Sequence, residues 1–436
     1  MPIRFISHTS STSGEEIRTW LASRDIAADG VEDRVRDIIA QVRSHGDQAV
    51  MDYTRRFDCP DLSPDGLRAS AANIAQALRD IPAGDMAVIS EAARNIREFH
   101  EHQKQNSWMT MPSPGVTLGQ LVLPVERAGL YVPGGQGGET PLISSLLMNA
   151  IPAQVAGVPN IHVVSPPRRD GTLNPYILAT AAILGIEHVY LCGSAWAVAA
   201  LAYGTETIPR VDVIAGPGNI FVTIAKRLVA GQVGIDMIAG PSEIAILADD
   251  TADPAWLAAD MLSQAEHDSL ASSLLISPDE SLLEKVRAEL SRQMGTLPRK
   301  GIAADALKNW SALIHVADLE TGMELVNLLA PEHFELSVAD PWAWTGRIRN
   351  AGAVFLGQHT PEPVGDYFAG PNHVLPTLAT ARFSSALSVE TFCKKTSLLA
   401  TDRNYLSLHG QKIARLARLE GLEAHARSVE QRLSAE

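Results

Sequence analysis

The amino-acid sequence predicts an α/β protein with two doubly wound domains, each built on a mostly parallel sheet that helices cover on both faces. Two observations predict this fold class. From about residue 116 onward, short apolar runs alternate with Ala- and Leu-rich segments of about ten residues, a pattern typical of parallel strands joined by crossover helices. The chain of 436 residues is also long for a single hydrophobic core.

The first hundred residues are predicted to be helical. Apolar residues recur at helical spacing from Val31 to Val42, and a second amphipathic run covers 85–105. A shorter helical piece at 15–22 precedes them. We expect residues 1–26 to form an N-terminal arm outside the core.

The first α/β region is predicted to extend to residue 247. Parallel strands linked by helices are buried on both faces, which explains their continuous apolar runs. Strands are expected at 115–124, 129–132, 161–165, 188–192, 211–214 and 244–247, and helices at 142–156, 175–184, 195–203 and 219–230.

The alternation resumes after a helix at 254–267, so we expect a second α/β domain. Beyond about Phe383 the chain is predicted to be helical to its end. The last helices carry an apolar face, and too few residues surround it to bury it. We therefore expect a partner, such as another subunit, to cover this face. Strands are expected at 272–277, 312–316 and 353–356, and helices at 282–293, 323–329, 387–395 and 404–433.

Composition excludes several classes of protein. A formal net charge of −14 with no basic cluster opposes binding to nucleic acid or anionic lipid. No apolar run resembles a signal peptide or a membrane span, so we expect a cytoplasmic protein. The chain has an odd number of cysteines, and none are spaced as CxxC: Cys59, Cys192 and Cys393. They support neither a disulfide framework nor a cysteine zinc site.

Two glycine clusters, at 132–138 and 215–219, follow predicted strands. Bare backbone amides at the carboxyl ends of parallel strands suit phosphates and other polar ligand groups. Neither cluster matches GxGxxG, and tight turns without a ligand explain them equally well. A third turn places Ser242 before a strand, near the same edge.

The helix at 254–267 carries a polar stripe. Asp253 and Pro254 are suited to its start, and Asp260, Gln264 and His267 follow at spacings of four and three residues. An amide oxygen beside an imidazole is half of a metal site. The alternative is a solvated amide and a last-turn histidine that faces the helix dipole.

Three further places carry polar groups suited to chemistry. Glu332 and His333 lie between a helix and a strand, where a carboxylate can tune an imidazole for general-base catalysis. Asp366 lies in the Gly- and Pro-rich run 361–385, and long ordered loops are usually functional. His425 lies in the helical tail. Each of these residues, taken alone, is also explained by surface or turn positions.

The motifs together resemble histidinol dehydrogenase over nearly the whole chain. Eight of them occur in the family's order. They are Gly-Leu-Tyr-Val-Pro-Gly-Gly from 129, Ala-Gly-Pro-Gly-Asn from 215, Ala-Gly-Pro-Ser-Glu from 239, Gln-Ala-Glu-His from 264, Ala-Pro-Glu-His from 330, Ala-Gly-Pro-Asn-His-Val-Leu-Pro-Thr from 369, Thr-Ala-Arg-Phe-Ser-Ser from 380 and Glu-Gly-Leu-Glu-Ala-His-Ala-Arg from 420.

The resemblance implies an enzyme that oxidises L-histidinol to L-histidine through L-histidinaldehyde, in two NAD-linked steps that end histidine biosynthesis. It implies that His333 is the base for the hydroxyl proton and that Glu332 activates water for the second step. The implied ligands of one Zn²⁺ per subunit are Gln264, His267, Asp366 and His425. The implied substrate contacts are these four residues with Ser242, Glu332, His333 and Glu420, and the implied NAD contacts are Tyr131 and Asn219.

The resemblance also implies a fold of two incomplete Rossmann-like domains, similar to aldehyde dehydrogenases, with small helical N- and C-terminal extensions in an intertwined homodimer. Residues 27–130 plus 242–387 are expected to hold the zinc and catalytic residues, and 131–241 the NAD contacts. Residues 388–436 are expected to cross to the partner subunit, where Glu420 and His425 would complete the other active site.

Two features depart from the family. Trp196 stands where the family commonly has a glutamine that contacts the cofactor, and an indole there could stack on a cofactor ring. The glycine loop before residue 143 is also longer. Three alternatives stay open: a paralogous zinc and NAD dehydrogenase of another small amino alcohol or diol, a zinc hydrolase, and a non-catalytic zinc-binding module.

Overall fold

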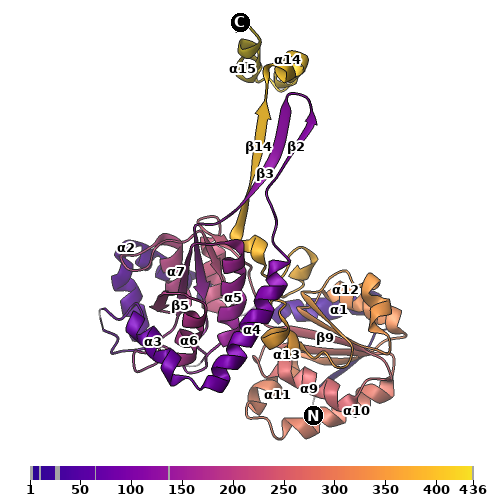
Figure 1. Ribbon diagram of the computed structural model, residues 1–436. Coiled ribbons are helices and arrows are strands. Elements are labelled where there is room, and N and C mark those ends of the chain that lie inside the picture. Colours follow the sequence, from indigo (N-terminus) through magenta and orange to yellow (C-terminus); the bar gives the residue numbers. More distant parts are fainter. Residues whose placement is uncertain (1–2, 9–10, 25–29, 64, 136–137, 435–436) are drawn as a thin grey trace.

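The computed structural model describes residues 3–8, 11–24, 30–63, 65–135 and 138–434. Its elements form two α/β units and an arm that projects from them, as Figure 1 shows. The predicted α/β fold class is therefore confirmed. Among the described residues, no helix is both long enough and apolar enough to cross a membrane.

The first unit is built on a five-stranded parallel sheet of order β6-β5-β4-β7-β8. Within this sheet β4 comes first in the sequence. Strands β5 and β6 are added on one side of it, and β7 and β8 on the other. Ligands of such sheets bind at the carboxyl ends of the strands where the direction switches, here β4 and β7. The strands are β4 (Arg127–Tyr131), β5 (Asn160–Ser165), β6 (His188–Leu191), β7 (Val213–Ala215) and β8 (Gly234–Ile235).

In the described part of the chain, seven helices surround this sheet. Four connect its strands, and three from the N-terminal region pack onto them: α2 on α7 and α8, α3 on α6, and α4 on α5. The helices are α2 (Val31–Phe57), α3 (Ala71–Asp80), α4 (Ala83–Glu101), α5 (Ile143–Ala156), α6 (Pro175–Ile183), α7 (Ser194–Tyr203) and α8 (Ile220–Val229).

This packing corrects the predicted domain division. The sequence pattern groups 27–130 with 242–387, whereas the structure places α2, α3 and α4 in the core of the first unit, with Val35 and Ile96 fully buried there. Amphipathic spacing shows which face of a helix is apolar, but it does not show which sheet covers that face. The predicted boundary at 131 also cuts through β4.

The second unit is a six-stranded parallel sheet of order β1-β11-β10-β9-β12-β13. It winds outward from β9 in both directions, as the first sheet does from β4. Helices α9, α10 and α11 cover one face and α12 the other. The elements are β9 (Glu243–Ala248), α9 (Pro254–Ala265), β10 (Ser272–Ser277), α10 (Glu280–Met294), α11 (Lys300–Trp310), β11 (Ala312–His315), α12 (Leu319–Leu329), β12 (His333–Ser337) and β13 (Ala353–Leu356).

The N-terminal segment belongs to this second unit and is not a separate arm. Strand β1 (Arg4–Ser7) pairs in parallel with β11 at the edge of the sheet. Helix α1 (Ser11–Ala22) packs on α12 and buries Ile17 and Leu21. A four-residue strand gives little sequence signal, which is why the prediction of an arm at 1–26 was wrong over its described part. Residues 1, 2, 9, 10, 25 and 26 lie outside the described residues.

The projecting arm is a three-stranded antiparallel sheet of order β14-β3-β2, with two helices at its tip (Figure 1). Strands β2 and β3 follow each other in the first third of the chain, whereas β14 lies near its C-terminal end. The elements are β2 (Trp108–Ser113), β3 (Val116–Pro124), β14 (Cys393–Thr401), α14 (Arg403–Leu419) and α15 (Glu423–Ser434).

The arm corrects two predictions for the C-terminal region. A helix at 387–395 is wrong, because only a 3₁₀ turn at Val389–Phe392 precedes β14. The long helix at 404–433 is broken at Gly421, whose left-handed φ of 76° lets the chain turn between α14 and α15. Strand β14 forms through pairing with β3, from far earlier in the chain, so no local pattern marks it.

The amino edge of the first sheet holds a buried imidazole whose protonation the fold opposes. His162 on β5 is 4% exposed and stacks on His188, with ring centroids 4.8 Å apart. Its Nδ1 lies 3.3 Å from the Tyr190 hydroxyl oxygen. Burial, reinforced by His188 and nearby arginines, lowers the pKa of His162 from 6.5 to about 4.

This imidazole predicts a loss of stability in acid. Between pH 6.5 and pH 4 the unfolded chain binds a proton that folded His162 rejects. The contribution is complete above the unfolded pKa and falls as the pH drops, by roughly 3 kcal/mol over this window. We expect the Tm of His162→Gln to fall less steeply than that of the wild type in melts across the window. Parallel Tm curves would contradict the assignment.

Candidate active site and metal centre

Glu332 and His333 lie where β12 begins, at the amino edge of the second sheet. His333 pairs with Ile244 of β9 in parallel register, which brings both side chains against Glu243. The backbone N–H of Glu243 donates to Glu332 Oε2 at 2.9 Å, and its carbonyl oxygen accepts from His333 Nδ1 at 3.0 Å. Sheet pairing thus holds a carboxylate and an imidazole 3.7 Å apart.

The second ring nitrogen of His333 is the one left for chemistry. Because Nδ1 donates to a carbonyl oxygen, Nε2 remains; it is buried without a hydrogen-bond partner and lies 3.5 Å from Asp366 Oδ1. Burial lowers the pKa of His333, but the charges of Glu332 and Asp366 outweigh it and raise the pKa to about 10. Burial raises the pKa of Glu332 to about 8. Such shifts are typical of groups that transfer protons.

Asp366 lies in the Gly- and Pro-rich loop and faces two histidines. Its segment, Gly365–Ala369, is a π-helical turn, a form frequently found at functional sites. Burial acts to raise the pKa of Asp366, but the hydrogen bond and charge of His333, with the charge of His373, lower it overall. His373 Nδ1 donates to the backbone oxygen of Asp366 at 3.0 Å. An ionised carboxylate is therefore held beside two imidazoles.

The end of α9 brings Gln264 and His267 to this place. Asp253 caps the helix by accepting from the backbone N–H groups of Ala255 and Trp256, and Pro254 occupies its first turn, as predicted. Gln264 is fully buried, yet neither atom of its side-chain amide has a hydrogen-bond partner. Leaving such a group unpaired costs about 1–3 kcal/mol, so a ligand is expected there.

Two observations tie the end of α9 to the Asp366 segment. Ser263 Oγ donates to Glu362 Oε2 at 2.9 Å. His267 is exposed, but desolvation by nearby protein atoms lowers its pKa, and the charges of Asp366 and His333 also act on it. The sequence-predicted residues Gln264, His267, Glu332, His333 and Asp366 therefore gather in one region.

The donor atoms fit a metal ion of the zinc class. Among the described residues, His333, Glu362 and Asp366 each offer one ligand atom within 4.8 Å of the other two. Gln264 adds an unpaired amide oxygen, and carboxylate, imidazole and amide donors suit Zn²⁺. Glu362 Oε2 already accepts from Ser263 Oγ, whereas no hydrogen bond occupies the Gln264 amide.

Several buried groups near this region were missed by the sequence prediction. Glu335 Oε1 accepts from the backbone N–H of Glu362 at 2.8 Å, and burial raises the pKa of Glu362 to about 7. Burial also raises the pKa of Asp260 to about 6, with a hydrogen bond to Glu335 that opposes the rise. The stripe of Asp260 with Gln264 was a usable signal for this acidic group. Glu243 lies in the Ala-Gly-Pro-Ser-Glu motif, but the sequence assigned it no role.

The remaining predicted substrate and metal residues lie in two places. Ser242 directly precedes Glu243, and its carbonyl oxygen accepts from the backbone N–H of Ser272 at 3.0 Å. Glu420 and His425 line a groove between α14 and α15. These helices lie at the tip of the arm, away from both α/β units of the same chain (Figure 1). One chain alone therefore does not bring His425 to Asp366.

Two of the predicted cofactor residues lie at the switch point of the first sheet. Tyr131 ends β4, and its hydroxyl oxygen accepts from the Ser194 backbone N–H at 3.1 Å. Asn219 caps α8 by accepting from two backbone N–H groups and is itself exposed. Gly216 has a φ of 122° and lies so close to the Tyr131 carbonyl that a side chain would collide with it. Residues 136 and 137 of the longer glycine loop lie outside the described part of the chain.

Trp196 does not offer its ring to a cofactor. The indole is 4% exposed and packs against Tyr53 and Phe57, at 5.7 Å from each ring centroid. Its Nε1–H donates to Thr54 Oγ1 at 3.0 Å. The ring is thus buried and its polar atom is bonded to α2, whose packing on α7 the sequence did not reveal, and we withdraw the stacking interpretation.

Comparisons with known proteins identify the family. The family model for histidinol dehydrogenase matches residues 21–433. The chain is 60% identical to the histidinol dehydrogenases of Oleidesulfovibrio alaskensis and Nitratidesulfovibrio vulgaris, over the full length of both chains. A crystal structure of histidinol dehydrogenase from Elizabethkingia anophelis superimposes with a TM-score of 0.92 at 36% identity, covering 99% of this chain and 98% of that one. The chain therefore belongs to the histidinol dehydrogenase family of oxidoreductases.

Proposed function

We propose that this enzyme oxidises L-histidinol to L-histidine through L-histidinaldehyde, with NAD as hydride acceptor and one Zn²⁺ per subunit. Family membership supports the substrate. The observation that carries the metal centre is Gln264, a buried amide without a partner at the end of α9, which Ser263 ties to the Asp366 segment.

The proposed zinc ligands are Gln264, His267 and Asp366, with His425 of the partner subunit. When bound, Zn²⁺ would supply a positive charge that anchors the imidazole and amine of histidinol, and NAD would supply the hydride acceptor. Ser242 and Glu420 of the partner subunit are the further proposed substrate contacts. An anchored substrate has a use here, because the aldehyde must stay bound between the two oxidations.

His333 is the proposed base of the first oxidation, in which the substrate hydroxyl loses a proton as its carbon loses a hydride. Nε2 is the ring nitrogen without a partner, and the Glu243 carbonyl holds Nδ1 in the tautomer that leaves Nε2 able to accept. Asp366 is among the charges that raise the pKa of His333. Its use as a metal ligand therefore favours the neutral imidazole that a base requires.

Glu332 is the proposed base of the second oxidation. The aldehyde carbon must gain an oxygen from water before a second hydride leaves, and that water must lose a proton. Glu332 is buried beside His333, and burial raises its pKa to about 8. A carboxylate with a raised pKa takes up a proton more readily than an ordinary one.

NAD is proposed to bind at the switch point of the first sheet, against Tyr131 and Asn219. Asn219 is exposed there at the start of α8, beside the close turn at Gly216. The positive end of the α8 dipole suits the pyrophosphate of a dinucleotide.

The arm is proposed to bind a second copy of the chain. Its apolar side chains are unusually exposed in the single chain: Met111 is 78% exposed, Leu399 70%, and Leu408 71%. Exposed apolar surface of this extent marks an interface. An intertwined homodimer would cover it and deliver Glu420 and His425 to the partner's site.

Counting NADH against histidinol tests this function. We expect two NADH for each histidinol consumed, with histidine as the product. Dialysis against a chelator is expected to lower the rate at least about 100-fold, and added Zn²⁺ is expected to restore it. A ratio of one NADH would leave only an alcohol dehydrogenase, and the absence of NADH would refute the proposal. Chelated enzyme at full rate would refute the metal centre.

A further inference from the structure

The backbone of a single residue, Glu243, contacts both proposed catalytic groups. The N–H of Glu243 donates to Glu332 Oε2 at 2.9 Å, and the C=O of the same residue accepts from His333 Nδ1 at 3.0 Å. Any displacement of Glu243 therefore moves the carboxylate and the imidazole together. Glu243 begins β9, the strand from which the second sheet winds outward, so its position also fixes Ser242.

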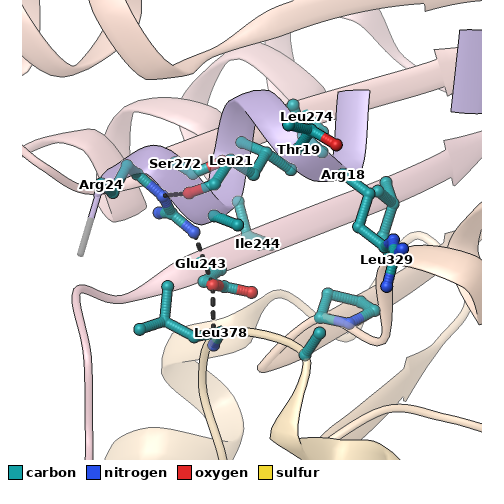
Figure 2. A pocket seen from close by; sticks show the side chains of 13 residues that line it. Arg18, Thr19, Leu21, Arg24, Glu243, Ile244, Ser272, Leu274, Leu329 and Leu378 are labelled. Atoms are coloured by element: carbon teal, nitrogen blue, oxygen red, sulfur yellow. Dashed lines mark hydrogen bonds and ion pairs between the residues drawn. The ribbon is translucent and has the colours of Figure 1, made fainter. Parts of the chain in front are cut away.

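The Glu243 side chain is held by two donors from distant parts of the chain, as Figure 2 shows. Arg24 Nη2 lies 2.5 Å from Glu243 Oε1, and the backbone N–H of Leu378 donates to the same oxygen at 2.9 Å. Arg24 is 3% exposed, and its remaining nitrogens donate to the carbonyl oxygens of Leu21 and Leu270. The guanidinium thus joins the end of α1 to β9, with a hydrogen bond from each of its three nitrogens.

The loop that supplies the Leu378 N–H is strained and locked in place. Leu378 and Ala379 have left-handed φ values of 51° and 61°, which non-glycine residues rarely adopt. Thr377 Oγ1 accepts from the backbone N–H of Gly240 at 2.6 Å, and a Cβ on Gly240 would collide with the Leu378 side chain. Glu243 is one of the contacts that hold this loop against the turn before β9.

Polar contacts, more than packing, fix Glu243 on its outer side. A mainly apolar cavity of about 330 Å³ borders the ion pair, between α1 and the starts of β9 and β10 (Figure 2). Leu21, Leu274 and Leu329 line it. Removing the ion pair would therefore leave Glu243 free to shift toward the cavity.

We infer that Arg24 and Glu243 form a positioning pair for the reaction: the ion pair sets where the backbone of Glu243 holds Glu332 and His333. This inference rests on the proposed function. It assigns a catalytic consequence to α1, which lies outside the proposed substrate, metal and cofactor residues. A displacement of about 1 Å at the reacting groups can lower a rate by about 100-fold.

Three variants test the pair, after wild-type enzyme has been shown to form NADH from histidinol. Glu243→Gln keeps an acceptor for Leu378 but removes the charge that faces Arg24. We expect kcat to fall about 10- to 100-fold, with the KM for NAD within about twofold and bound zinc unchanged. Arg24→Met should match it. Arg24→Lys, which keeps a cation that can reach the carboxylate, should recover most of the lost kcat.

A buried ion pair in the other unit provides the matched control. Lys226 and Asp236 are as buried as Arg24 and Glu243, and they bind the carbonyl oxygen and the N–H of Gly216 in the proposed NAD turn. Lys226→Met should therefore raise the KM for NAD about tenfold and change kcat at saturating NAD by less than about threefold. Loss of the Arg24–Glu243 pair is therefore expected to lower kcat, whereas loss of the Lys226–Asp236 pair is expected to raise the KM for NAD.

Retention of kcat within about twofold in Glu243→Gln would overturn the inference, as would equal losses in Arg24→Lys and Arg24→Met. If Glu243→Gln does not fold, the comparison of the two Arg24 variants decides, at temperatures well below their Tm. Wild-type enzyme without histidinol-dependent NADH formation would instead refute the proposed function, so the two failures are distinguishable.

Discussion

Glu332→Gln is expected to slow the second oxidation by about 10²- to 10⁴-fold while the first loses less than about tenfold. Only the second step adds water to a carbonyl, so only that step needs a group to take the water's proton. The glutamine can still accept from the Glu243 N–H through its side-chain oxygen, so the geometry around His333 survives. What is lost is the proton acceptor.

Single-turnover traces measure the two steps separately. With excess NAD, wild-type enzyme should release two equivalents of NADH in one progress curve, and Glu332→Gln should release the first and then stall. Aldehyde supplied directly should be oxidised slowly by the variant and should still be reduced when NADH is present. His333→Asn is the matched comparison, because it should slow the alcohol step instead. Equal losses in both steps for Glu332→Gln would contradict its role.

The two parallel sheets follow from local sequence patterns. Each crossover unit is indicated by a short apolar run, a turn and a helix of about three turns. Residues 160–165 followed by Pro175–Ile183 are an example. The cap at Asp253 and the Pro in the next position mark the start of α9 correctly for the same reason. Such signals depend on neighbours in the sequence, so they survive without knowledge of the tertiary structure.

The elements that the sequence did not reveal depend on distant partners. Strand β1 exists because it pairs with β11, some 300 residues later, and β14 because it pairs with β3. Trp196 shows the same limit for a single side chain. Its position in the family suggested a cofactor contact, whereas α2 packs against α7 and encloses the ring.

In the candidate site, too, some residues could be recognised from local motifs and others depend on distant partners. Residues that carry chemistry in recognisable motifs, such as Glu332, His333 and Asp366, could be named from the sequence. Glu243 and Arg24 could not, because their importance lies in which backbone atoms and charges they meet. Glu243 stands in the Ala-Gly-Pro-Ser-Glu motif beside Ser242, yet the motif does not show that its backbone holds the proposed catalytic pair. A sequence motif identifies residues that take part in the reaction more readily than residues that hold them in position.

Two inactive variants, mixed, are expected to regain about a quarter of the wild-type activity. Asp366→Asn removes a proposed ligand in the second unit, and His425→Asn removes one at the arm tip. Each homodimer should fall at least about 10³-fold, because every site lacks a ligand. In a hybrid dimer, the His425→Asn chain keeps its own Asp366 and receives an intact His425 from its partner, so one of the two sites is whole.

Random pairing makes half of the dimers hybrids, and half of their sites are intact, which gives about one quarter. Co-refolding the two variants in equal amounts and measuring kcat per chain tests the number. Asp366→Asn mixed with Gln264→Ala is the control, since both lesions lie in the second unit and no pairing can repair a site. Recovery in the first mixture but not in the control requires that the arm of one subunit completes the other's metal centre. If each chain used its own His425, both mixtures would stay inactive.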